Sequence, residues 1–133
     1  MLEQEVIEVV KKFDLFLNPE EAIAFVMNYV DANHHILNCA YDSMGRDGMK
    51  RFFYADFTDM IRTIINKVEI GTGISTDESF KQTVCAFYTE ALAGMLIDYF
   101  QYKGKYDREE LIHSVLLILQ VSIPNILIAK SNE

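Results

Sequence analysis

The sequence has 133 residues and a formal net charge of −8, and half of its residues are hydrophobic. A chain of this length and composition suits one folded domain with a substantial core, which excludes a disordered or fibrous protein. The acidic balance disfavours binding of DNA or RNA by this chain, because an acidic surface repels phosphate groups.

The first two predicted elements are helices. Apolar residues recur at helical spacing over residues 2–17, with charged residues on the opposite side, which predicts an amphipathic first helix. A second helix is predicted to begin at Pro19, because Asn18 can cap it and proline needs no amide partner at the first helical position. This second helix is expected to run to about Tyr41.

A turn is predicted at residues 42–48, DSMGRDG, which contain two glycines and two aspartates. A third helix should follow, beginning near Asp47 and passing through Val68. Ser75 and Glu78 have the spacing of a capping box, in which two side chains satisfy the free amides at a helix start, and they predict a fourth helix.

The fifth helix is predicted to start at Asp107, which forms a similar box with Glu110. No segment alternates between apolar and polar residues with a period of two, so no sheet is expected. The sequence therefore predicts an all-α fold, a single domain over residues 1–133 with about five helices in an antiparallel bundle.

Several protein classes are disfavoured by local features. The N-terminus has no basic start followed by an apolar run, so no signal peptide is predicted. Residues 115–128 are the longest apolar region, but polar residues and Pro124 interrupt them, so neither a transmembrane span nor a membrane partner is expected. Cys39 and Cys85 are too few for a disulfide scaffold or a zinc site, and we expect reduced thiols in a cytoplasm.

The fourth and fifth helices are apolar on nearly every face. Only Thr89 and Glu90 are polar within residues 84–97. Each large side chain left exposed would forfeit about 1.5–3 kcal/mol of burial, so we expect a twofold homodimer in which these helices form a four-helix interface. A single compact core that wraps both helices remains the alternative. The expected interface residues are Ala91, Gly94, Met95, Leu111, Val115, Leu116 and Leu119.

Two runs carry a resemblance to a known family. FYTEALAGMLIDYF at residues 87–100, followed by a Gly104 turn and DREELI, resembles the end of the C-terminal domain of TetR-family transcriptional regulators, particularly the type common in Firmicutes. NPEEAIAFVMNYVDAN at residues 18–33 resembles the same domain. Tyr99 stands where this subgroup often has Trp. The helix-turn-helix with which the family begins does not precede Leu2, so we expect either a fragment of a regulator or a protein that lacks the DNA-binding part.

The resemblance implies a domain that dimerises through its last two helices and encloses a pocket for a small hydrophobic effector. It also implies a regulator, most simply a repressor, that contacts DNA only through a helix-turn-helix absent from this chain. The sequence does not distinguish residues that line such a pocket from residues that fill the core. The candidate ligand-binding residues are Tyr29, Asn33, Phe53, Phe57, Met60 and Tyr88.

Metal and catalytic interpretations have less support. Asp31, His35 and Cys39 lie one turn apart on a predicted helix and could supply three zinc ligands, but no second ligand pair has matching spacing. Cys39 and a neighbouring histidine on one helix lack the oxyanion donors that nucleophilic catalysis needs. We therefore expect no metal, no cofactor and no enzyme. The alternative to a regulator domain is a stand-alone helical interaction adaptor.

Overall fold

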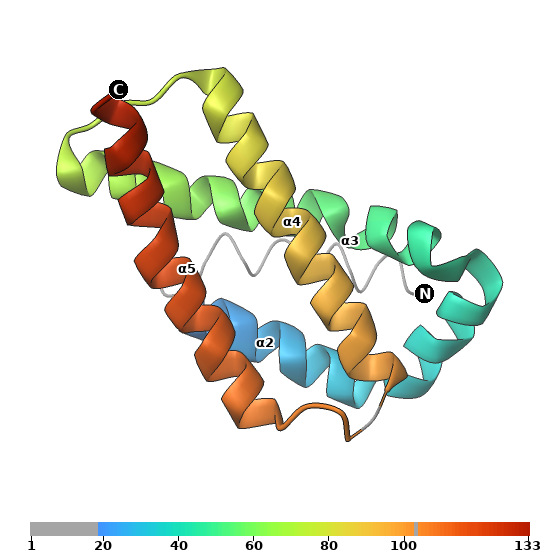
Figure 1. Ribbon diagram of the computed structural model, residues 1–133. Helices are drawn as coiled ribbons and strands as arrows, with labels where there is room; N and C mark the ends of the chain where they lie inside the picture. Colours follow the sequence, from blue (N-terminus) through green and yellow to red (C-terminus); the bar gives the residue numbers. More distant parts are fainter. Residues whose placement is uncertain (1–18, 103) are drawn as a thin grey trace.

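A computed structural model describes residues 19–102 and 104–133, which form four helices (Figure 1). Helix α2 spans Pro19–Ala32, α3 spans His34–Thr72, α4 spans Glu78–Gln101 and α5 spans Arg108–Ser131. The described residues contain no strand, so the predicted all-α class is confirmed. The helix predicted at residues 2–17 lies outside the described residues.

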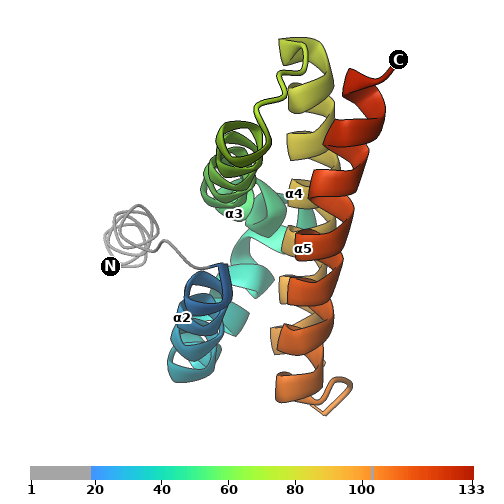
Figure 2. The same ribbon diagram turned by 90° about the vertical axis from the view of Figure 1, so that its left-hand side faces the viewer.

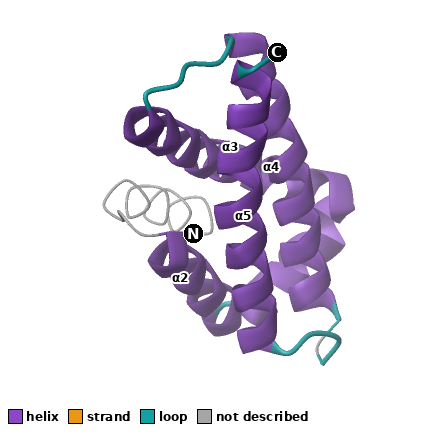
Figure 3. Ribbon diagram, turned by 60° about the vertical axis from the view of Figure 1, so that its left-hand side comes forward, coloured by secondary structure: helices purple, strands orange, loops and turns teal. Residues whose placement is uncertain are grey.

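The helices are arranged around one layer. Figure 2 shows α4 and α5 forming this layer, with α2 and α3 on one side of it and no described helix on the other. Helix α3 packs closely along α4, α2 contacts α5, and the backbones of α4 and α5 hardly approach each other. Short loops join α3 to α4 and α4 to α5 (Figure 3). The outer face of the layer is therefore available to other molecules.

The break between the second and third helices differs from the prediction. Helix α2 ends at Ala32 and not near Tyr41, because Asn33 adopts a non-helical ψ of 23° and its side-chain amide donates to the Tyr29 carbonyl at 2.9 Å. The turn predicted at residues 42–48 is only a kink within α3. Gly45 alone leaves helical geometry, with a φ of 75° in the left-handed region that favours glycine.

Aspartates cap the starts of α4 and α5. The Asp77 carboxylate accepts a hydrogen bond from the Phe80 amide at 2.8 Å, so the cap of α4 is Asp77 and not the predicted Ser75. Asp107 caps α5, as predicted, but its carboxylate accepts from the amide of Glu109 at 3.2 Å. A carboxylate at a helix start satisfies free amides and suits the positive end of the helix dipole.

The core draws apolar side chains from all four described helices. Helix α5 continues through Pro124, which interrupts the apolar run of residues 115–128 without ending the helix. Among the described residues it is the one helix long and apolar enough to cross a membrane, by length and composition only. A core helix passes the same test, and five α5 side chains pack inside the chain, namely Ile112, Leu116, Leu119, Ile123 and Leu127.

Candidate functional site

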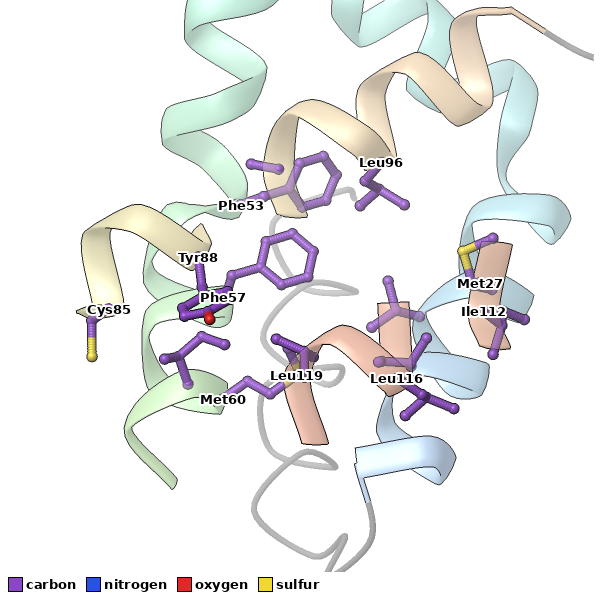
Figure 4. Close-up of a cluster of buried hydrophobic side chains, with 14 of the residues drawn as sticks. Met27, Phe53, Phe57, Met60, Cys85, Tyr88, Leu96, Ile112, Leu116 and Leu119 are labelled. Carbon is purple, nitrogen blue, oxygen red and sulfur yellow. The ribbon is translucent and has the colours of Figure 1, made fainter. Parts of the chain in front are cut away.

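An apolar cavity of about 50 Å³ lies among the four described helices. In Figure 4, Met27 from α2 and Ile112 from α5 stand on one side of this region, and Phe57 and Met60 from α3 stand on the other. Among the described residues that line the cavity, Tyr99 alone carries a polar group. The lining residues are Ile23, Val26, Met27, Phe57, Met60, Leu92, Met95, Leu96, Tyr99, Leu111, Ile112 and Val115.

Two of the six residues expected to bind a ligand line this cavity, namely Phe57 and Met60. Phe53 is buried next to Phe57, and the centres of the two rings lie 6.1 Å apart. Both phenylalanines are 6% exposed, so burial alone does not distinguish a lining residue from a core residue.

The other three expected ligand-binding residues have separate contacts. The hydroxyl groups of Tyr88 and Ser122 are hydrogen-bonded at 2.5 Å, which joins α4 to α5. Tyr29 and Asn33 form the contact that ends α2. None of these three side chains borders the cavity.

Most of the lining was not expected at a ligand site, and three of its residues, Met95, Leu111 and Val115, were expected at the dimer interface instead. The apolar spacing of Ile23, Val26 and Met27 on α2 was an available signal, since it marks one helix face. Together with Met60 and Met95, Met27 gives the cavity three methionines. Methionine is unbranched and flexible, so these side chains can adjust to an irregular occupant.

A polar cluster lies beside the cavity and joins α2 to α4 and α5. The Tyr99 hydroxyl donates to one oxygen of Asp31 at 2.7 Å, and Arg108 Nε donates to the other oxygen at 2.9 Å. The Arg108 guanidinium also contacts Asn28 and donates to Glu109 at 2.6 Å. Burial and the hydrogen bond to Asp31 raise the pKa of Tyr99 to about 12. The cluster therefore holds α2 against the layer.

The possible zinc ligands are dispersed. Among the described residues, no three His, Cys, Asp or Glu side chains are placed to hold a metal ion. His35 Nε2 and Cys39 Sγ lie 3.9 Å apart on the exposed surface of α3. Asp31 instead interacts with Tyr99 and Arg108.

One buried carboxylic acid was not anticipated. Asp56 on α3 is only 8% exposed. Burial, with a smaller effect of the nearby Asp59 charge, raises the pKa of Asp56 to about 7. Asp56 does not line the cavity, and its burial disfavours the charged form of its carboxyl group.

The residues expected at a dimer interface fall into two groups. Ala91 is exposed, and Gly94, Met95, Leu111 and Val115 are half-buried. Leu116 and Leu119 are 7% and 2% exposed, so they pack inside the chain and offer no surface to a second one. The large apolar side chains that α4 and α5 do expose are Phe87, Leu117, Ile118, Val121 and Ile128.

Sequence comparison identifies the family of this helical domain. A family model described as transcriptional regulator C-terminal region, TetR_C_8, matches residues 17–120. The match covers every residue named above as lining the cavity. Neither a curated protein nor a solved structure matches the chain significantly. The chain belongs to the TetR-type transcriptional regulator C-terminal regions, the family that its sequence resembles.

Proposed function

We propose that this chain is the effector-sensing and dimerisation domain of a TetR-like repressor, with no catalytic activity of its own. Family membership supports the regulatory role. The observation that carries the sensing role is the apolar cavity shared by α2, α3, α4 and α5, because a molecule bound there touches every described helix. A hydrophobic small molecule is the matching effector class, since the lining is almost wholly apolar.

Effector binding has to change the structure. Small-molecule sites usually occupy about 300–1,000 Å³. The cavity measures about 50 Å³, so an effector must displace its walls. Outward movement of α2 from the layer is the proposed signal, which a helix-turn-helix domain outside this chain would convert into release of DNA. The regulator acts in the cytoplasm, where the DNA lies.

We assign the homodimer to the outer face of α4 and α5. Five large apolar side chains are exposed on these two helices, and burying each would contribute about 1.5–3 kcal/mol. In a twofold dimer, the same apolar face of each copy is buried against the other copy. Phe87, Leu117, Ile118, Val121 and Ile128 thus replace Leu116 and Leu119 as the proposed contacts.

The sensing role is tested by screening hydrophobic small molecules for a rise in the thermal midpoint. A ligand at a hundredfold excess over its dissociation constant stabilises the folded state by about 2.7 kcal/mol. Phe57→Ala, at the cavity, should alter the stabilisation by a hit, whereas Phe53→Ala is a matched control of equal exposure away from the cavity. Equal responses of the two variants, or no hits, would count against the cavity.

The dimer is tested by sedimentation velocity. Val121→Asp places a charge among the exposed apolar side chains and should yield a folded monomer at micromolar concentration. Gln120→Asp introduces the same charge at the neighbouring exposed position and should remain dimeric. A well-folded wild-type monomer at high concentration would contradict the dimer. That result would favour a helical adaptor whose exposed apolar side chains bind a different protein.

A further inference from the structure

A surface groove lies on the other side of one cavity wall. It measures about 320 Å³ and is bordered by the end of α4, the start of α5 and the loop between them. Met95 and Leu111 line both the groove and the apolar cavity. These two side chains therefore lie between the cavity and the groove at this end of the layer.

Side-chain rotation is the simplest way to open this wall. Met95 and Leu111 are half-buried, and the backbones of α4 and α5 hardly approach each other. Neither side chain has a polar group that needs a hydrogen-bond partner, and the methionine side chain has three rotatable bonds. Opening the wall thus requires no separation of packed helices, in contrast to any opening between α3 and α4, which pack closely.

We propose that the cavity and the groove are two parts of one site for an amphipathic molecule, with its apolar portion in the cavity and its polar head in the groove. This inference rests on the effector-sensing role proposed above. The cavity of about 50 Å³ is too small for an effector unless its walls move, and the groove of about 320 Å³ offers further room for the head group. The groove also supplies polar groups, such as the Ser114 hydroxyl, that the cavity lacks.

The charges that border the groove select the head group. The Lys105 ammonium lies 3.4 Å from a carboxylate oxygen of Asp98 and 5.3 Å from the ring centre of Tyr106. The Asp107 carboxylate caps α5. Glu110 is exposed and has no ion-pair partner among the described residues. The head group that fits is therefore uncharged or cationic, and an anionic head is disfavoured.

The test uses three probes with one eight-carbon chain, namely octyltrimethylammonium, 1-octanol and octanoate, below their micelle concentrations. Isothermal titration calorimetry should show octyltrimethylammonium and octanol binding at least tenfold more tightly than octanoate. Benzene serves as a probe of the cavity alone. Ser114→Trp, which fills the groove, should weaken octyltrimethylammonium and octanol at least tenfold and leave benzene unchanged.

A second variant tests the head group without adding bulk. Glu110→Lys reverses a charge at an exposed position and should shift the preference from octyltrimethylammonium to octanoate. Asp42→Asn on α3, which contributes nothing to the groove, should leave all affinities unchanged. Binding of octanol and benzene without any effect of head group or of Ser114→Trp would overturn the single site and leave the cavity as the effector site. Failure of every probe to bind would instead overturn the effector role itself.

Discussion

The two halves of the α4–α5 layer differ in what they enclose and what they expose. In the half where Tyr88 bonds to Ser122, α5 packs Ile123 and Leu127 inward, fully buried, and exposes apolar side chains outward. In the other half, α4 and α5 provide cavity walls on the inside and a polar groove on the outside. We call these the packed half and the hollow half. One pair of helices can thus offer a protein-binding face at one end and a ligand site at the other.

Carboxylic acids show the same contrast. Asp56 lies near the packed half, where Thr58 and Thr89 join α3 to α4 at 3.2 Å, and burial raises its pKa to about 7. Asp98 lies in the hollow half. Although burial raises its pKa, hydrogen bonds from Lys105 and Arg46 outweigh that effect and hold the pKa of Asp98 below its usual value. Burial therefore favours the protonated form of Asp56, whereas two cationic partners favour the charged form of Asp98.

The largest expected effect comes from removing a leucine in each half. Leu127→Ala in the packed half should lower the free energy of unfolding by about 3–5 kcal/mol, because a fully buried side chain leaves a new cavity. Leu111→Ala makes the same change at a half-buried side chain, which has less buried surface to lose, and should cost about 1–2 kcal/mol. Urea unfolding measures both. Equal losses would remove the distinction between the halves.

A smaller effect is expected at Asp56. Its pKa rises from an ordinary 3.8 to about 7 on folding, so the folded state holds the proton more tightly. The free energy of unfolding should therefore fall as the pH rises from about 4 to about 7. Asp56→Asn removes this dependence and should stabilise the protein at pH 8 by about 1–2 kcal/mol, a figure reduced for partial solvation.

The control for that prediction is Asp59→Asn at the exposed neighbour, which should produce a much smaller gain. Thermal or urea unfolding at pH 4.5 and pH 8 distinguishes the two variants. A variant Asp56→Asn with wild-type pH dependence would show that Asp56 is hydrated in solution and that the packed half admits water.

The smallest predicted effect concerns the polar cluster at the hollow half. Tyr99→Phe removes the hydrogen bond to Asp31 and should cost about 1 kcal/mol. Because folding raises the pKa of Tyr99 to about 12, wild-type stability should fall as the pH rises from about 10 to about 12, and the variant should lose less. Tyr54→Phe, at an exposed tyrosine, is the control for general alkaline effects. Identical alkaline profiles would contradict this role of Tyr99.

Much of the fold could be predicted from the sequence. Helical spacing, Pro19 and the cap at Asp107 located the beginnings of α2 and α5 correctly. The breaks were harder, because turn-forming residues do not show how many positions leave helical geometry. Within residues 42–48, Gly45 alone leaves helical geometry and the helix continues. At Asn33, by contrast, a helix ends although no glycine or proline is present.

The site was less accessible to sequence reasoning. Phe57 and Met60 were identified, but the spacing between helices decides which apolar side chains line a cavity, and no local pattern records that spacing. The outer face of α5 was also ambiguous. Since this helix is apolar around most of its circumference, periodicity could not tell inward Leu116 and Leu119 from outward Leu117 and Ile118.

The cluster around Asp31 has a consequence for the order in which the chain folds. Its hydrogen bonds join residues 68 and 77 positions apart, from Asp31 to Tyr99 and to Arg108. By contrast, α3 and α4 are consecutive helices joined by a short loop, so their pairing closes a smaller loop and loses less chain entropy. During synthesis, α3 and α4 can therefore form a hairpin first, while α2 gains its contact with Arg108 only after the start of α5 has left the ribosome.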